Sequence, residues 1–238
     1  MIATRKSRNH RILTLIPARS GSKGIPKKNL QVIGGLSLVE WAIEVAIKAG
    51  LNDIVLSSDS EEILELGKKY SIRRLRRPCT IANDESKTIE VVLHALESMG
   101  SDYDAVLLLQ PTSPLRSAED VEQSIVMLRN YADATSIISV VDVGAAHPLR
   151  AFSMLANQRL TPYLNNSNEF EGVPRQILPP AYVPNGAIYL TKTETLLSSR
   201  SFWGDSPQGF VMPLERSVNI DSPLDLEIAR FFVEKHVP

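Results

Sequence analysis

A short apolar run that leads into a glycine-rich, basic loop most restricts how this 238-residue chain can fold. Residues 12–16 are almost entirely apolar, which is typical of a buried strand. In the loop that follows, Gly21 and Gly24 allow the backbone to approach an anion closely, with main-chain N–H groups pointing toward it. Four cationic side chains add charge that would favour a polyphosphate: Arg19, Lys23, Lys27 and Lys28. The segment therefore predicts a strand followed by a phosphate-binding loop.

The spacing of this loop excludes two familiar phosphate-binding motifs. The P-loop, G-x-x-x-x-G-K-[ST], needs a lysine after its second glycine, but here Lys23 precedes Gly24. The dinucleotide-binding pattern G-x-G-x-x-G is also absent, because the next glycine after Gly24 is Gly34. An ordinary solvated loop with four cations stays open as the alternative.

Four segments of the chain together resemble a known family. They read IPARSGSKGIPKKN at 16–29, LQPTSPLR at 109–116, PRQILP at 174–179 with PNGAIY at 184–189, and NIDSPLDL at 219–226. On these motifs the chain resembles the CMP-sialic acid synthetases, the acylneuraminate cytidylyltransferases, from about residue 12 to its last helix. The resemblance implies that the anomeric hydroxyl of a 2-keto sugar acid attacks the α-phosphate of CTP, with magnesium bridging the triphosphate.

Composition restricts the class of protein and its surroundings. A net charge of −1 gives no reason to expect binding to nucleic acid or to a membrane. No apolar run reaches the roughly 18 residues that a membrane span needs. The single cysteine, Cys79, rules out an internal disulfide, fits a cytoplasmic protein and is expected to be buried. The basic segment 1–11 is expected to be a flexible leader.

Two other kinds of chemistry find no support in the sequence. The four histidines, His10, His94, His147 and His236, are scattered and show no metal-ligand spacing. The G-x-S-x-G motif of serine hydrolases is absent. A basic loop, a polar loop after a central strand and a C-terminal acidic site instead suit nucleotidyl transfer, in which positioning and charge neutralisation dominate.

Strand and helix patterns alternate along the chain. Ser37 with Glu40, and Ser117 with Asp120, form capping boxes that predict helix starts. Helices are expected near 38–49, from 61 onward, near 87–99 and 118–130, after 193 and after 222. Strands are expected near 12–16, 54–56, 72–75, 105–109, 135–143, 187–190 and 210–212. This order predicts the α/β class: a Rossmann-like nucleotidyltransferase sheet, mostly parallel but mixed, flanked by helices in a single domain over residues 12–238.

Residues 144–184 interrupt this alternation, because they are rich in proline and asparagine and show no sustained period. A loop of this length in a compact domain is usually functional. The resemblance implies that the segment is an inserted arm that forms a homodimer and reaches into the active site of the partner.

The resemblance also assigns roles to individual residues. It places Lys28, Arg19 and Asp221 in catalysis. The residues assigned to substrates are Ser22, Lys23 and Asn29 for CTP, Arg77, Ala82 and Ser86 for cytosine, Gln110, Asn185 and Tyr189 for the sugar, Gln176 for the substrate, and Arg150 and Arg175 for the sugar carboxylate across the dimer.

The metal site departs from the family pattern. Magnesium is expected at an Asp-Ile-Asp sequence, which here reads Asn219-Ile220-Asp221. An amide oxygen can bind a hard cation but lacks the charge, although strand alternation would keep positions 219 and 221 on one side. Three functions stay open. The motifs at 174–189 favour a cytidylyltransferase for nine-carbon nonulosonic acids such as sialic or legionaminic acid. The alternatives are a cytidylyltransferase for the eight-carbon 3-deoxy-octulosonate and a non-catalytic nucleotide-binding homologue.

Overall fold

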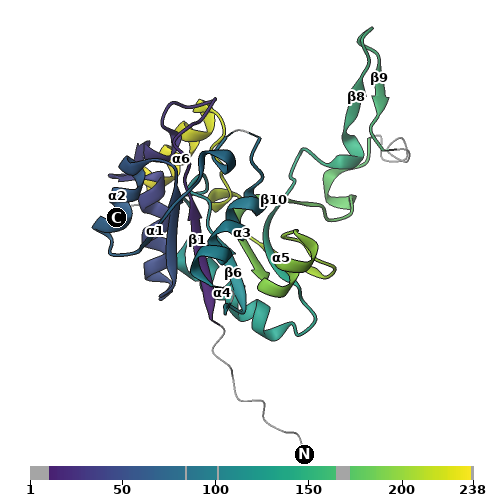
Figure 1. Ribbon diagram of the computed structural model, residues 1–238. Coiled ribbons are helices and arrows are strands. Elements are labelled where there is room, and N and C mark those ends of the chain that lie inside the picture. The colour runs from purple at the N-terminus through teal and green to yellow at the C-terminus, as the bar shows by residue number, and fades with distance from the viewer. Residues whose placement is uncertain (1–10, 84, 101, 165–171, 237–238) are drawn as a thin grey trace, which may run out of the picture.

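The computed structural model describes residues 11–83, 85–100, 102–164 and 172–236 (Figure 1). Its centre is a seven-stranded sheet with the order β11-β7-β10-β6-β1-β4-β5. The strands are β1 (Ile12–Pro17), β4 (Ile54–Ser58), β5 (Arg73–Arg76), β6 (Ala105–Leu108), β7 (Ser136–Asp142), β10 (Tyr182–Lys192) and β11 (Pro207–Val211). β10 is antiparallel to both β6 and β7, and the other neighbours are parallel. The predicted mixed, mostly parallel α/β sheet is confirmed.

The helices lie close to where the sequence predicts them. They are α1 (Leu38–Lys48), α2 (Glu61–Lys69), α3 (Thr88–Met99), α4 (Ala118–Asn130), α5 (Thr193–Ser199) and α6 (Pro223–His236). The capping boxes are present at α1, where Ser37 Oγ accepts from Glu40 N, and at α4, where Ser117 Oγ accepts from Asp120 N. Local signals therefore fixed the helix starts.

The core has two layers because helices cover both faces of the sheet (Figure 1). In β1, Ile12 and Ile16 face the layer formed with α1, α2 and α4, whereas Leu13 and Leu15 face α3 and α5. Every residue of β6 is buried, as expected for a central strand. Burial of each such aliphatic side chain contributes roughly 1.5–3 kcal/mol relative to exposure.

The segment between β7 and β10 extends away from the body of the molecule (Figure 1). It contains the hairpin β8 (Phe152–Met154) and β9 (Leu160–Pro162), together with the 3₁₀ turns η3 (Pro148–Arg150) and η5 (Arg175–Ile177). Strands of three residues are too short to show alternation, which explains why the sequence predicted no elements here. Several large apolar side chains of this arm are more than half exposed: Phe152, Met154, Leu160, Tyr163 and Ile177.

The two edge strands carry distinctive residues. In β5, Arg73, Arg74 and Arg76 are exposed and pair with the carboxylates of Asp53, Glu65 and Glu61, as expected of a solvated face. At the other edge, β11 begins at Pro207.

Three further predictions concern the cysteine, the N-terminal leader and membrane-spanning helices. Cys79 is exposed, so the prediction of a buried thiol was wrong; it lies in the surface turn η2 (Cys79–Ile81). Residues 1–10 of the expected leader lie outside the described residues. Among the helices that the structure describes, none is long and apolar enough to cross a bilayer.

Candidate active site

A cleft of about 330 Å³ lies at the carboxyl ends of β1, β5 and β6. Ligands of open α/β sheets bind at this end of the strands. The predicted residues that line the cleft are Arg19, Ser22, Lys28, Asn29, Arg77, Ser86, Gln110, Asn219 and Asp221. The fold therefore brings the first, second and last of the four sequence motifs together.

The glycine-rich loop is tied to the end of β4. Asp59 accepts hydrogen bonds from Ser20 N at 2.8 Å and from Ser20 Oγ at 2.5 Å. Burial acts to raise the pKa of the Asp59 carboxyl, but these hydrogen bonds outweigh it and bring the pKa below its ordinary value. Asn29 Nδ2 donates to Arg19 O at 2.9 Å and closes the loop on itself. The loop is thus held in shape before any ligand binds.

The lysines of the loop point in different directions. Lys28 lines the cleft, whereas Lys27 has a left-handed backbone (φ 47°) and its ammonium pairs with Glu62 at 2.8 Å. Lys23 is exposed and does not line the cleft. Of these three lysines, only Lys28 lines the cleft.

Arg77 contributes a buried positive charge to the cleft. Only 5% of the residue is exposed, and its guanidinium donates to Ser57 O at 2.9 Å and Ser57 Oγ at 3.3 Å. Burial lowers the pKa of Arg77 to about 10, an effect that nearby Asp59 opposes and Arg19 adds to. A buried guanidinium held by two neutral oxygens is a favourable partner for an anion or for the carbonyl of a base.

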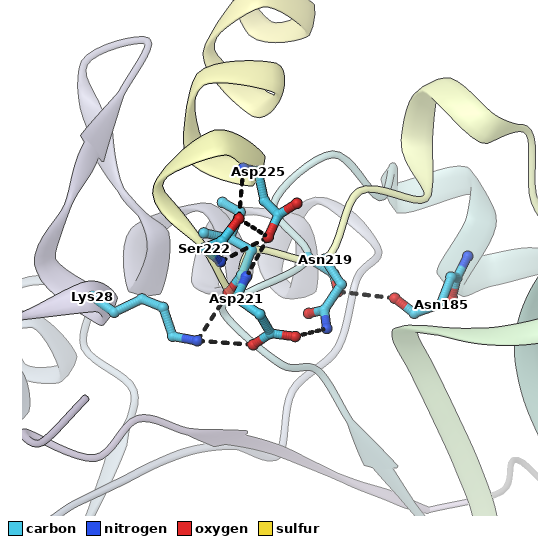
Figure 2. Close-up of polar contacts among 8 residues, drawn as sticks. Lys28, Asn185, Asn219, Asp221, Ser222 and Asp225 are labelled. Carbon is cyan, nitrogen blue, oxygen red and sulfur yellow. Dashed lines mark hydrogen bonds and ion pairs between the residues drawn. The ribbon is translucent and has the colours of Figure 1, made fainter. Parts of the chain in front are cut away.

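The predicted metal pair lies beside Lys28 (Figure 2). Lys28 Nζ is 3.0 Å from Asp221 Oδ1 and 2.9 Å from Ile220 O. Asn219 Nδ2 donates to Asp221 Oδ2 at 2.8 Å, so the two side chains share one side, as expected, although they lie in a loop and not in a strand. Asp225 Oδ2 accepts from Asp221 N, Ser222 N and Ser222 Oγ at 2.7–3.0 Å and fixes the turn into α6.

The residues present fit a magnesium ion that arrives with a nucleotide. Asn219 Oδ1 is buried and has no hydrogen-bond donor, which leaves an acceptor beside the Asp221 carboxylate. Among the described residues, no group of three or more His, Cys, Asp or Glu side chains could hold a metal ion. Magnesium commonly uses one or two protein oxygens together with phosphates and water, so this small donor set suits it.

Other predicted residues lie away from the cleft. Asn185 is buried in a bulge of β10, where its amide bonds with Ser139 Oγ at 2.6 Å and Ser217 Oγ at 2.9 Å and so supports the fold. Tyr189 packs against Phe202, with ring centroids 5.5 Å apart. Ala82 does not line the cleft either. Within this one chain, the remaining three residues are exposed on the arm: Arg150, Arg175 and Gln176.

A match to a protein-family model accompanies this geometry. Residues 13–168 match the model described as cytidylyltransferase, which is more than half of the chain. The chain belongs to the cytidylyltransferase family. The resemblance drawn from the four motifs is confirmed at this level.

Relatives within the cytidylyltransferase family cover nearly the whole chain. It is 30% identical to N-acylneuraminate cytidylyltransferase of Escherichia coli O18:K1:H7 over 224 residues, or 92% of this chain and 51% of that protein. It is 29% identical to CMP-N,N'-diacetyllegionaminic acid synthase of Legionella pneumophila over 239 residues, or 94% and 97%. The chain therefore spans about half the length of some relatives and nearly all of another.

The fold also matches solved cytidylyltransferase structures. A CMP:2-keto-3-deoxy-manno-octonic acid synthetase complexed with CTP superposes with a TM-score of 0.70 at 16% identity, covering 95% of this chain and all of the other. At that level of identity the match supports the fold and not the choice of sugar.

Sequence reasoning missed several residues of this cytidylyltransferase cleft. Asn83, Thr88 and Thr112 line it. Asn83 is adjacent to the predicted Ala82, Thr88 lies two residues after the predicted Ser86, and Thr112 is within a quoted motif. Arg116 was quoted only as part of a motif, yet it is buried, donates to Ala187 O at 2.7 Å and Gln110 O at 2.6 Å, and so holds the loop after β6. Burial lowers the pKa of Arg116 to about 9.

A glycine lets β10 pass close behind two residues that line the cleft, Gln110 and Asn219. Gly186 has φ +78°, and a Cβ there would lie 3.1 Å from Gln110 Oε1 and 3.5 Å from Asn219 Cγ. A side chain at this position would strain the backbone and crowd both amides. The signal in the sequence was the Asn-Gly pair, which favours positive φ.

Proposed function

We propose that this protein transfers cytidylate from CTP to the anomeric hydroxyl of a nine-carbon 2-keto sugar acid. In this reaction the hydroxyl loses its proton, an oxygen–phosphorus bond forms at the α-phosphate, and pyrophosphate leaves. The observation that carries the proposal is the joint placement of Arg19, Lys28 and Arg77 around one cleft that also contains Asn219 and Asp221. Three cations converging on a cleft favour a polyphosphate ligand.

Each residue of the cleft suits one part of this reaction. The glycine-rich loop with Arg19 would orient the triphosphate, and Lys28 would stabilise charge that develops on the transferring phosphate. Arg77 and Ser86 also line the cleft and would contact the cytosine. Asp221 and Asn219 would hold a magnesium ion, whose contribution when bound is to neutralise charge on the triphosphate.

The relatives support a nine-carbon sugar. Relatives that cover nearly the whole chain are named for N-acylneuraminate, N,N'-diacetyllegionaminic acid and pseudaminic acid, all nonulosonic acids. The eight-carbon alternative gains no support from the structural neighbour named for such a sugar, because at 16% identity that match shows the fold alone. The non-catalytic alternative is motivated by Asn219, whose amide cannot supply the charge of a carboxylate.

The arm supports a homodimer as part of this proposal. Its exposed apolar side chains, Phe152, Met154 and Tyr163 among them, would be covered by a second copy. Arg150 and Arg175 lie on the same arm and could then reach the sugar site of the partner. Cytoplasmic location stays a prediction that rests on the single cysteine.

The deciding experiment measures pyrophosphate release from CTP with magnesium and, in separate reactions, sialic acid, legionaminic acid and 3-deoxy-octulosonate. We expect release with a nine-carbon acid and none when the sugar is omitted. Release with only the eight-carbon acid would favour the alternative sugar class. CTP binding without release from any of the three would favour the non-catalytic homologue.

A further inference from the structure

Both oxygens of the Asp221 carboxylate accept from a donor of this chain (Figure 2). Lys28 Nζ pairs with Oδ1 at 3.0 Å, and Asn219 Nδ2 donates to Oδ2 at 2.8 Å. The Lys28 side chain is only 16% exposed and is further held by Ile220 O at 2.9 Å. An ammonium therefore lies where a cation would be expected to approach this carboxylate.

The negative charge of the Asp221 carboxylate is balanced by the positive charge of the Lys28 ammonium. Because position 219 is an asparagine, the direct contact joins one carboxylate, Asp221, to one ammonium, Lys28. The neighbouring Asp225 carboxylate is engaged by Ser222 N, Ser222 Oγ and Asp221 N at the start of α6, where the helix dipole offsets its charge. A metal ion alone would thus meet a site with little net negative charge, and like charges at contact distance repel strongly.

We infer that Lys28 takes the place of the metal on Asp221 until a nucleotide binds, so that a divalent cation reaches Asp221 only together with a triphosphate. This inference rests on the proposed function. Lys28 lines the cleft, so phosphate oxygens offer its ammonium a second partner. Movement of Lys28 to the phosphate would free Asp221 Oδ1 and place the catalytic cation at the reacting group. One lysine thereby couples metal entry to nucleotide binding.

The test titrates Mn²⁺ into the full chain without nucleotide and follows free Mn²⁺ by electron paramagnetic resonance. Lys28→Met removes the ammonium and keeps the length of the side chain. Lys27→Met is the matched control, because Lys27 is adjacent but pairs with Glu62 outside the cleft. We expect Lys28→Met to bind Mn²⁺ about fivefold more tightly than wild type. The Asp221 side chain is 70% exposed, so solvent screens its ion pair with Lys28, and the pair is worth no more than about 1 kcal/mol, which corresponds to that factor. Lys27→Met should titrate like wild type.

The double variant Lys28→Met with Asp221→Asn should lose the gained affinity, which would place the bound Mn²⁺ on Asp221. Equal affinity in wild type and Lys28→Met, including the absence of measurable binding in both, would overturn the inference. If Lys28→Met folds poorly by circular dichroism, Lys28→Gln provides the same comparison. The titration uses no substrate, so its result is independent of the test of the proposed function. The inference can be overturned although the wild-type protein releases pyrophosphate, and it can hold although the wild-type protein releases none.

Discussion

Replacing Arg77 by methionine should stabilise the protein in the absence of CTP and abolish the further stabilisation that CTP binding gives. Burial of the guanidinium lowers the pKa of Arg77 from its ordinary value to about 10. Folding therefore disfavours the charged form by at most roughly 3 kcal/mol. Loss of the two hydrogen bonds to Ser57 costs about 1 kcal/mol each. The difference is a gain of about 1 kcal/mol, in line with the replacement of other buried charges by apolar side chains.

The measurement is urea unfolding with and without CTP. At a CTP concentration about 100 times its Kd, wild type should gain about 2.7 kcal/mol and Arg77→Met almost nothing. The order of stability should thus invert when CTP is added. Arg76→Met is the control, because Arg76 is exposed and pairs with Glu61 at 2.9 Å; its stability should change by less than about 0.5 kcal/mol. An Arg77→Met variant that keeps the CTP response, or is less stable than wild type by more than about 1 kcal/mol, would refute the reasoning.

Four further predictions follow from the same contacts. Lys28→Ala should fold and retain less than about a tenth of wild-type kcat, since a lost charge at the transferring phosphate is worth more than ~1.4 kcal/mol; a smaller loss, measured by pyrophosphate release, would contradict its role. Asn219→Asp should lower the magnesium concentration that gives half-maximal activity and Asp221→Asn should raise it steeply; unchanged titrations in both would place the metal elsewhere. Folding lowers the pKa of Asp59, so its contribution to stability is present above the unfolded pKa of about 3.9 and is lost as pH falls through the folded value. In Asp59→Asn, the urea concentration at the midpoint of unfolding should therefore fall less steeply than in wild type as the pH is lowered. Sedimentation should show a dimer at micromolar concentration and a monomer for Phe152→Glu, and a fully active wild-type monomer would exclude the arm as a required interface.

Much of the fold was predictable because its signals are local. The Ser37–Glu40 and Ser117–Asp120 pairs start helices through contacts within one turn, and the apolar residues of β6 require cover on both faces. The hairpin of the arm was not predictable in this way. Its strands pair over only three residues each, and their side chains are mostly exposed, so neither alternation nor burial marks them.

The candidate site was predictable where one loop carries it. Arg19, Ser22, Lys28 and Asn29 lie within a single motif, and the structure places all four in the cleft. Asn185 shows why the rest was harder: its neighbours Ser139 and Ser217 are 46 and 32 residues away, and only the folded chain reveals that they satisfy its amide. The role of Arg116 likewise depends on Ala187, 71 residues later.

The edges of the sheet determine how copies of this chain can associate. At β5, a strand added by a second molecule would have to displace or desolvate Arg73, Arg74 and Arg76 with their carboxylate partners. At β11, Pro207 has no N–H to donate, so an incoming backbone would find the ladder broken at its first residue. Fibre-like growth through backbone pairing is therefore disfavoured at both ends. The dimer that we propose would instead use side-chain contacts on the β8–β9 hairpin, where a pair of molecules would close on itself and stop.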